Sequence, residues 1–494
     1  MFTSVVGIRL GVAITAAVAL ALAFPKTNFG WLAPLAAAGL FWSWSAFSWK
    51  GAFWVGWCAG TVFFAINYGW FSHTVGSLVG HLSFLLVLGP AVLEGFYFGL
   101  AAACAAFAYR FASRGAAPIA AAAGFTICEW MRSIGPIGVP FGQLGYSQLE
   151  TPLAVFAAYA GTYGVTFTVC VIGAYIADAI TYRNNARLLY ALATLTVCWG
   201  AAWSAWPARH MQPPTVRVAA IQGNIAQSVK WSSKALQTAV RRYSSLSLQT
   251  AAFKPQLIAW PETVITTVLS ADPRLSAQLG ALARQLSTTL VVGTTSRRDG
   301  REYNVLYVYG PQGTILGVYE KRQLVPFAES FPGQAWLSWL PYANLITGFG
   351  AGRQNAVYPA VFPFAPLICW ESAFADLAHA QLRAGAKLFV IATDDAWFGE
   401  TAGPYAHAKI AQMRAIEAGT WVVRAASTGI SGVIAPDGRF VRASDLNREA
   451  IVLGSVGEPP GSVFAHLGPT LVGFTLSLIY VATVLLGISR RAWT

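Results

Sequence analysis

Long apolar runs, interrupted by one long polar segment, most constrain how this 494-residue chain can fold. A helix of about 20 residues is long enough to cross the ~30 Å hydrocarbon core of a bilayer. Runs of that order lie at about 4–24, 29–48, 52–72, 80–112, 116–134, 151–182, 187–206 and 467–488. The sequence therefore predicts a membrane protein of eight helical spans, with seven before the polar segment and one after it.

The polar segment, residues 209–466, holds 23 of the 33 Lys and Arg and 16 of the 20 Asp and Glu. Its length is sufficient for a sizeable core of its own. We therefore expect a transmembrane bundle at 1–208, a folded polar domain at 209–466, and a last span with its tail at 467–494. The net charge of +13 contains no run of five basic residues, so we expect no nucleic-acid partner.

The basic residues of the short loops predict the orientation, because cytoplasmic loops carry the excess of Lys and Arg. One set of alternate loops and ends holds Lys50, Arg110, Arg114, Arg183, Arg187, Arg490 and Arg491. The other set holds Lys26, Arg132 and Arg209. We therefore expect both termini in the cytoplasm and the polar domain on the outer side of the membrane.

Cysteine usage singles out one residue of the polar domain. Five of the six cysteines lie in apolar runs, and only Cys369 lies in the polar domain. Domains in an oxidising compartment usually pair their cysteines. Cys369 is therefore either a buried, inert side chain or a thiol retained for its reactivity.

Apolar strand-like runs and amphipathic helical segments alternate along the polar domain. The runs lie at 216–224, 256–262, 289–296 and 387–398, and the helical segments at about 233–252, 273–287, 374–385 and 404–418. Turn residues within 303–321 and 421–440 predict hairpins. The expected fold class is therefore α/β, a mixed-sheet sandwich covered by helices, joined to a membrane α-helical bundle.

Three polar residues directly follow apolar runs: Glu262, Lys321 and Cys369. Taken singly, each fits a helix cap, a solvated turn or a core position. In open α/β sheets, however, reactive groups gather at the carboxyl ends of strands. A free thiol is only a few per cent thiolate at neutral pH. Glu262 could take its proton, while Lys321 could favour the thiolate and stabilise an oxyanion.

At these residues the chain resembles the carbon-nitrogen hydrolase (nitrilase) superfamily. WPET at 260–263, YEKRQLVPFAESFP at 319–332, LICWES at 367–372 and TDDAWFG at 393–399 follow that superfamily's order. The chain is similar in particular to its membrane branch, the apolipoprotein N-acyltransferases, through QGNIAQSVKW at 222–231 and GQLGYSQ at 142–148.

The resemblance implies an eight-span bundle with an exterior αββα sandwich inserted before the last span, in the bacterial inner membrane with the sandwich on the periplasmic side. It implies a Glu262-Lys321-Cys369 triad that moves an acyl chain from the sn-1 ester of a phospholipid, such as phosphatidylethanolamine, through a thioester. The acceptor would be the amino-terminal diacylglyceryl-cysteine of an apolipoprotein, in the last step of lipoprotein maturation. We expect a monomer that needs no cofactor and no metal.

Other residues receive supporting roles. By the resemblance, Glu329 is a second carboxylate near the lysine, while Glu371 shares a strand face with Cys369 and could equally hold a loop through backbone hydrogen bonds. Three tryptophans flank the site and would shield the thioester from water, or else belong to an aromatic core or interfacial belt: Trp231, Trp370 and Trp397.

The chain departs from the family pattern at Phe141, Asp394 and Ser427, where Trp, Asn and Asn are usual or frequent. None of these departures removes a triad member. Glu94 and Glu129 lie within apolar runs, where a carboxylate suggests function or a hydrogen bond to a neighbouring helix.

Two other functions use the same features. A membrane-anchored amidase would need the same triad, but an anchor needs only one span. A transporter or assembly factor would need the spans, but would not need an intact Glu262, Lys321 and Cys369.

Overall fold

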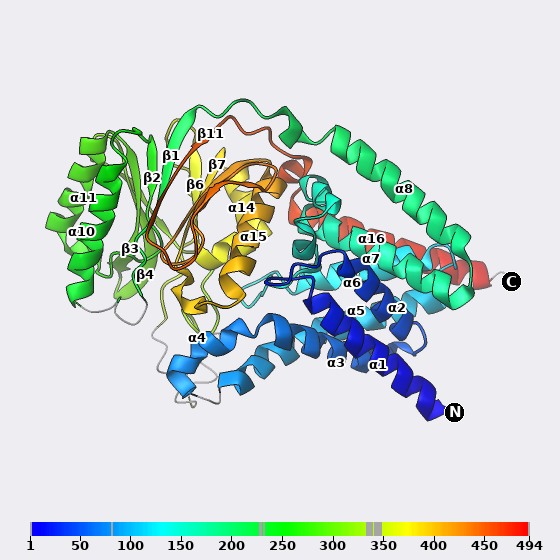
Figure 1. Ribbon diagram of the computed structural model, residues 1–494. Coiled ribbons are helices and arrows are strands. Elements are labelled where there is room, and N and C mark those ends of the chain that lie inside the picture. Colours follow the sequence, from blue (N-terminus) through cyan, green and yellow to red (C-terminus); the bar gives the residue numbers. More distant parts are fainter. Residues whose placement is uncertain are drawn as a thin grey trace.

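The computed structural model describes residues 2–80, 83–226, 230, 233–331, 339 and 348–492. A helical region and an α/β sandwich lie side by side, and both chain termini lie at the end of the helical region that faces away from the sandwich (Figure 1). Trp231 lies outside the described residues.

The helical region consists of α1 (Phe2–Ala21), α2 (Leu32–Trp44), α3 (Trp49–Asn67), α4 (Trp70–Val79), α5 (Ser83–Phe111), α6 (Ala117–Met131), α7 (Ala157–Tyr182), α8 (Asn185–Ser204) and α16 (Val463–Ala492). Short 3₁₀ helices, η2 (Leu144–Gln148) and η3 (Pro152–Phe156), precede α7. Helix α8 packs along the outside of α7, and none of its described side chains is buried.

Three helical stretches in the described chain are long and apolar enough to cross a membrane: Leu85–Phe111, Pro152–Tyr182 and Val463–Arg491. Shorter apolar helices lie at Val6–Ala21, Leu32–Trp44 and Ala117–Met131. The predicted run at 52–72 is divided between two helices, because α3 ends at Asn67 and α4 begins at Trp70. A set of several apolar helices is therefore present, whereas the count of eight spans stays a prediction.

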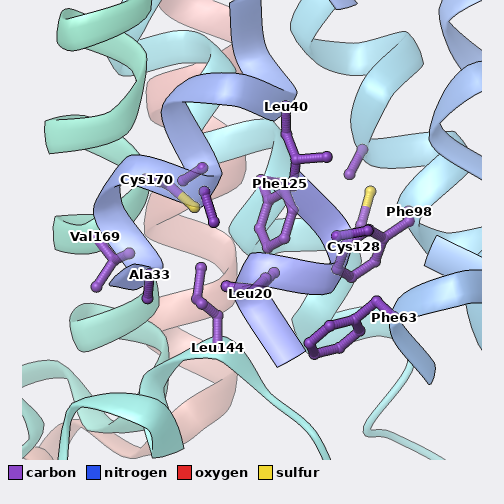
Figure 2. Close-up of a cluster of buried hydrophobic side chains, with 14 of the residues drawn as sticks. Leu20, Ala33, Leu40, Phe63, Phe98, Phe125, Cys128, Leu144, Val169 and Cys170 are labelled. Carbon is purple, nitrogen blue, oxygen red and sulfur yellow. The ribbon is translucent and has the colours of Figure 1, made fainter. Parts of the chain in front are cut away.

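The helices pack closely through small residues and aromatic rings (Figure 2). Gly60 of α3 faces α5, where an added Cβ would lie 2.4 Å from the Cβ of Phe98. Phe98 in turn stacks on Phe63, with ring centroids 5.3 Å apart. Such close approach is how helices associate where lipid removes the hydrophobic driving force between them.

The sandwich contains two mixed sheets. The six-stranded sheet has the order β11-β1-β2-β3-β4-β5 and the five-stranded sheet the order β10-β9-β8-β7-β6. The strands of the first are β1 (Val216–Gln222), β2 (Leu257–Ala259), β3 (Thr289–Arg298), β4 (Arg301–Tyr309), β5 (Ile315–Glu320) and β11 (Ala450–Val456). Those of the second are β6 (Phe364–Ile368), β7 (Leu388–Thr393), β8 (Trp421–Ala426), β9 (Gly432–Ile434) and β10 (Phe440–Ala443). Strands β1, β2 and β3 are parallel, as are β6, β7 and β8.

Two helices cover the outer face of each sheet (Figure 1). They are α10 (Ser233–Gln249) and α11 (Pro273–Leu286) on the first sheet, and α14 (Ala375–Arg383) and α15 (Gly403–Ala418) on the second. Alternate strand residues, among them Val218, Val291 and Val390, meet between the sheets, and their neighbours face the helices. The α/β sandwich predicted from the alternating pattern is therefore present as four layers, αββα.

Helix α15 joins the sandwich to the helical region. Helix α7 is kinked at Gly161, whose φ is +66°, so the following amide, that of Thr162, begins a new helical segment. Glu417 of α15 accepts hydrogen bonds from Thr162 N at 2.6 Å and from its hydroxyl. The same carboxylate lies 2.8 Å from the Arg414 guanidinium, which also donates to the Tyr146 hydroxyl at 3.1 Å. All of these groups are buried.

Replacing Glu417 with alanine is expected to lower the free energy of unfolding by about 3–5 kcal/mol, because it leaves the charge of Arg414 buried and unpaired. Reversible denaturation in detergent would measure the loss. The matched control is Glu458→Ala, which removes a half-exposed pair with Lys387 and is expected to cost at most about 1 kcal/mol. Equal losses in the two variants would show that the Arg414–Glu417 pair does not stabilise the junction.

Candidate active site

The three polar residues that follow strands converge on one site. Glu262 lies three residues beyond β2, and Lys321 directly follows β5 of the same sheet. Cys369 directly follows β6 of the other sheet. Lys321 Nζ lies 2.9 Å from Glu262 Oε1, and both charges act on the Cys369 thiol. The site therefore lies where strand ends of the two sheets meet.

Lys321 is held between two carboxylates. Its Nζ also lies 2.9 Å from Glu329 Oε1. Asn304 Nδ2 donates to the same two oxygens, at 2.7 Å to Glu262 and 3.1 Å to Glu329. Lys321 is only 1% exposed, so its charge is compensated almost entirely by these partners.

This pairing keeps both partners ionised. Burial raises the pKa of Glu262, but the charge and hydrogen bond of Lys321, together with Asn304 and Lys230, bring that pKa below its usual range. Burial lowers the pKa of Lys321, but the carboxylates of Glu262 and Glu329 raise it well above the usual lysine value. Glu262 is therefore an ionised carboxylate able to accept a proton, and Lys321 a permanent cation.

Cys369 has the backbone of a strained turn residue. Its φ is +49°, in the left-handed region that residues with a Cβ rarely adopt. Strand β6 ends at Ile368 and the 3₁₀ helix η6 (Cys369–Ala373) begins at once, so the thiol lies on a sharp corner between them. Strain of this kind is found at functional sites when the surrounding structure enforces it.

The resting thiol is protonated. Burial, followed by the charge of Glu262, raises the pKa of Cys369 well above the usual thiol value, and Lys321 only partly opposes them. As expected, Lys321 lowers the pKa of the thiol, but burial and Glu262 raise that pKa by more, so the thiolate is not favoured overall. A nucleophile here needs a base that removes the proton as attack proceeds, and Glu262 is the ionised carboxylate beside it.

Glu371 ties the lysine loop to the cysteine corner. Its carboxylate accepts from the amides of Arg322 at 2.6 Å and Ile368 at 2.8 Å, and from the Tyr319 hydroxyl at 3.0 Å. Burial raises the pKa of Glu371. These contacts join the residues beside Lys321 and Cys369, so Glu371 fixes their separation through backbone hydrogen bonds.

A second buried ion pair supports Glu262. The main-chain amide of Asp394 donates to Glu262 Oε2 at 3.0 Å. The Asp394 carboxylate pairs with Lys230 and accepts a hydrogen bond from the Ser427 hydroxyl. Lys230 Nζ also lies 3.4 Å from the Glu262 carbonyl oxygen. The side chains of Asp394 and Ser427, both singled out in the sequence, are thus hydrogen-bonded to each other.

Comparisons with known proteins identify the family. The model of the apolipoprotein N-acyltransferase N-terminal domain matches residues 16–175, and that of the carbon-nitrogen hydrolases matches residues 217–457. Curated proteins called apolipoprotein N-acyltransferase from Allorhizobium ampelinum and Azotobacter vinelandii are 35% and 32% identical to this chain. The matches cover 81% and 90% of this chain, and 79% and 88% of theirs. The chain belongs to the apolipoprotein N-acyltransferase family.

Two further similarities cover different shares of the chain. The apolipoprotein N-acyltransferase of Haemophilus ducreyi is 29% identical to this family member, over 95% of this chain and 94% of its own. A solved amidase from Nesterenkonia sp. is 18% identical, with a TM-score of 0.40, over 52% of this chain and 94% of the amidase.

Phe141 lies against Trp370, the residue that follows Cys369 in the chain. Its ring stacks on Trp370 with centroids 4.9 Å apart and planes at 11°. Phe141 also lies near Phe398, which packs edge to face on Trp70 of α4. These rings, called here the aromatic cover, are Trp70, Phe141, Trp370 and Phe398. They form a continuous set of ring contacts from α4 to the residue that follows Cys369.

Of the two other tryptophans predicted to shield the site, the structure describes Trp397. Trp397 is 46% exposed, and its main-chain carbonyl accepts from the Thr74 hydroxyl at 2.9 Å. It lies next to Phe398 of the aromatic cover along the chain, but nearly half of its surface is exposed. Trp231 is outside the described residues.

The acidic residues within the helices position the loop that carries Phe141. Arg132 lies 3.2 Å from Glu94 and 3.6 Å from Glu129, and donates to the Phe141 carbonyl at 3.0 Å. Glu129 also accepts from Leu144 N at 2.9 Å. The buried charges of Arg132 and Glu129 thus hold the loop that carries Phe141 and Leu144.

Sequence reasoning missed several residues of the site. Lys230 and Asn304 contact Glu262, and His407 lies 3.1 Å from the Cys369 carbonyl oxygen. The only sequence signal for these three was that Lys230 lies inside the quoted motif at 222–231. Within the described residues, no group of three or more His, Cys, Asp or Glu is arranged to hold a metal ion.

Proposed function

We propose that this chain moves an acyl chain from a membrane phospholipid to the amino-terminal cysteine of an apolipoprotein, with Cys369 as the nucleophile. The name shared by relatives at 27–35% identity supports the N-acyltransferase activity and its place in lipoprotein maturation. The observation that carries the mechanism is the Glu262–Lys321 ion pair beside a partly buried thiol at a strained strand end.

The first half-reaction forms a thioester. Glu262 takes the proton of the Cys369 thiol as the sulfur attacks the sn-1 ester carbonyl, and Lys321 stabilises the oxyanion that develops. When the carbon–oxygen bond breaks, Glu262 returns the proton to the departing alkoxide. The products are a lysophospholipid and an acyl chain bound to Cys369, with Glu262 again ionised.

The second half-reaction transfers the acyl chain to an amine. The acceptor amine attacks the thioester carbonyl, Glu262 takes a proton from nitrogen, and the carbon–sulfur bond breaks as the proton passes to the sulfur. An α-amino group with a pKa of about 7.7–8.0 is appreciably neutral at physiological pH, whereas a lysine amine near 10.4 is almost wholly protonated. This difference favours an amino-terminal acceptor over a lysine side chain.

Transfer to an amine also requires that water be kept from the thioester. We assign this shielding to the aromatic cover, because Trp370 is adjacent to Cys369 in the chain and is 8% exposed. Trp231 and Trp397 remain further proposals for the same role. The donor is proposed to be phosphatidylethanolamine, and the protein a monomer without cofactor or metal.

The proposed topology has eight spans in the bacterial inner membrane. Its parts are a bundle at 1–208, a periplasmic carbon-nitrogen hydrolase domain at 209–466 inserted before the last span, and residues 467–494. Two observations support cytoplasmic termini: both termini lie at the end of the helical region away from the sandwich (Figure 1), and Arg132 is a buried partner of Glu94 that cannot act as a loop charge. When Arg132 is left out, one set of loops and ends holds seven basic residues and the other holds two.

A reporter that is active only outside the cytoplasm tests this topology. Fused near residue 300, it is expected to be active, because that position lies in the sandwich. Fused at residue 185 or after residue 494, it is expected to be silent. The reverse pattern would contradict the proposed orientation.

Incubating the protein with phospholipid alone tests the order of the two half-reactions. Because Cys369 must carry the acyl chain before an amine can take it, about one lysophospholipid per protein is expected to be released, after which release stops. Adding a diacylated peptide with a free amino-terminal cysteine should restart it, and an amino-acetylated peptide should not. Continuous release of free fatty acid would indicate a lipid hydrolase instead.

A further inference from the structure

A buried polar network lies behind the nucleophile and takes no part in the proton transfers described above. Its centre is the Asp395 carboxylate, which accepts from His407 Nδ1 at 2.9 Å, Arg424 Nη2 at 2.7 Å and the Thr393 hydroxyl at 2.9 Å. All four side chains are buried. With three donors from β7, β8 and α15, the carboxylate is fixed, and it fixes the imidazole of His407 in turn.

The other nitrogen of His407 faces the main chain of the nucleophile. His407 Nε2 lies 3.1 Å from the Cys369 carbonyl oxygen and 3.0 Å from Ser372 Oγ. The Ser372 hydroxyl donates to the same carbonyl at 2.8 Å. Both ring nitrogens of His407 donate, to Asp395 and to the Cys369 carbonyl, only in the imidazolium form, which carries a proton on each nitrogen. In that form the carbonyl is held by two side chains, one of which is anchored by Asp395.

Holding this carbonyl determines where the next amide points. The peptide bond between Cys369 and Trp370 is planar, and in a trans peptide the C=O and N–H point in opposite directions. A carbonyl fixed toward His407 therefore turns the Trp370 N–H to the opposite side. Because Cys369 has a φ of +49°, this orientation needs support from outside the local chain.

We propose that His407 is a positioning residue that fixes the Cys369–Trp370 peptide, so that the Trp370 N–H donates to the oxyanion formed during acyl transfer. This inference rests on the proposed function, since it adds to that reaction a positioning residue, His407, that acts through the main chain of Cys369. Preorganised donors of this kind act in the transition state more than in substrate binding.

Two substitutions at position 407 distinguish the loss of the hydrogen bond from the loss of packing. His407→Leu fills a similar volume but cannot donate, and it is expected to slow thioester formation about 10²-fold, the cost of losing one oxyanion donor. The phospholipid concentration at half-maximal rate should change less than about twofold. His407→Gln, which carries an N–H at the position of Nε2, is expected to recover most of the rate.

The matched control is Gln412→Leu. Gln412 is also on α15 and also donates to a main-chain carbonyl, that of Gly438 at 2.7 Å, but this carbonyl belongs to a turn away from Cys369. The control is expected to form the thioester at the rate of the unsubstituted protein. Ser372→Ala removes the second donor to the Cys369 carbonyl and is expected to slow thioester formation about tenfold.

The experiment uses the full-length protein in detergent with phosphatidylethanolamine, quenched at successive times, with the acyl adduct on Cys369 followed by mass spectrometry and the melting temperature of each variant recorded. No adduct on the unsubstituted protein would overturn the proposed function itself. An adduct formed at the unsubstituted rate by His407→Leu would overturn only the positioning role, as would a His407→Gln variant as slow as His407→Leu. If His407→Leu does not fold, an unchanged rate in Ser372→Ala overturns the role.

Discussion

Replacing Cys369 with alanine or serine is expected to abolish acyl transfer, with a loss of about 10⁴-fold or more in turnover. Alanine has no nucleophile. Serine places a hydroxyl at the same corner, but an alcohol loses its proton far less readily than a thiol, and Glu262 with its lowered pKa is too weak a base to remove it. Transfer of radiolabelled acyl chains from phospholipid to a diacylated peptide would measure both variants.

The control for this prediction is a cysteine outside the site. Cys198 of α8 is exposed, and Cys198→Ala is expected to keep full activity. The melting temperatures of all three variants should match that of the unsubstituted protein. Near-normal transfer by Cys369→Ala would remove the proposed nucleophile and the mechanism with it.

Replacing Glu262 with glutamine is expected to lower the rate of thioester formation by about 10³-fold, the usual contribution of a general base. Glutamine keeps the size and shape of the side chain, but its single carbonyl oxygen can accept from Lys321 or from the Asp394 amide and not from both. The residual rate should rise as the pH is raised, because the thiol of Cys369, whose pKa lies well above the usual value, must then lose its proton to solvent.

The unsubstituted protein should show no such rise, since its base is already ionised: the pKa of Glu262 lies below the usual glutamate value. Lys321→Ala is expected to lose activity to a similar degree, because it removes the cation that faces the oxyanion and leaves Glu262 and Glu329 as unscreened neighbours. A Glu262→Gln rate equal to that of the unsubstituted protein would contradict the role of this residue as the base.

The site residues that could be predicted from the sequence are those that follow the ends of strands. Glu262, Lys321 and Cys369 each follow an apolar run, and polar residues at that position are brought together when parallel strands share an edge. The helices α10, α11, α14 and α15 also follow from apolar spacing, and their observed bounds differ from the expected ones by up to three residues. Local pattern is therefore enough for the layers and for the residues at their edges.

The remainder depends on contacts between segments far apart in the chain. Lys230 pairs with Asp394, and His407 with Asp395, but no local pattern records which buried charges meet. The kink at Gly161 has a similar origin: an added Cβ would lie 2.6 Å from Phe464 of α16, a residue some 300 positions later. A single sequence gives residue types but not these distances, so Lys230, Asn304 and His407 were missed, while Glu262, Lys321 and Cys369, which stay predictions as reacting residues, were singled out by their place at strand ends.

The mass of the intact protein after incubation with phospholipid alone tests the central claim most directly. The account predicts an increase by one acyl chain, located on Cys369 by peptide mapping, stable in buffer and lost when a diacylated peptide with a free amino terminus is added. It also predicts no increase in Cys369→Ala. An unmodified Cys369 in protein that still acylates the peptide would contradict the account, because transfer would then proceed without the thioester.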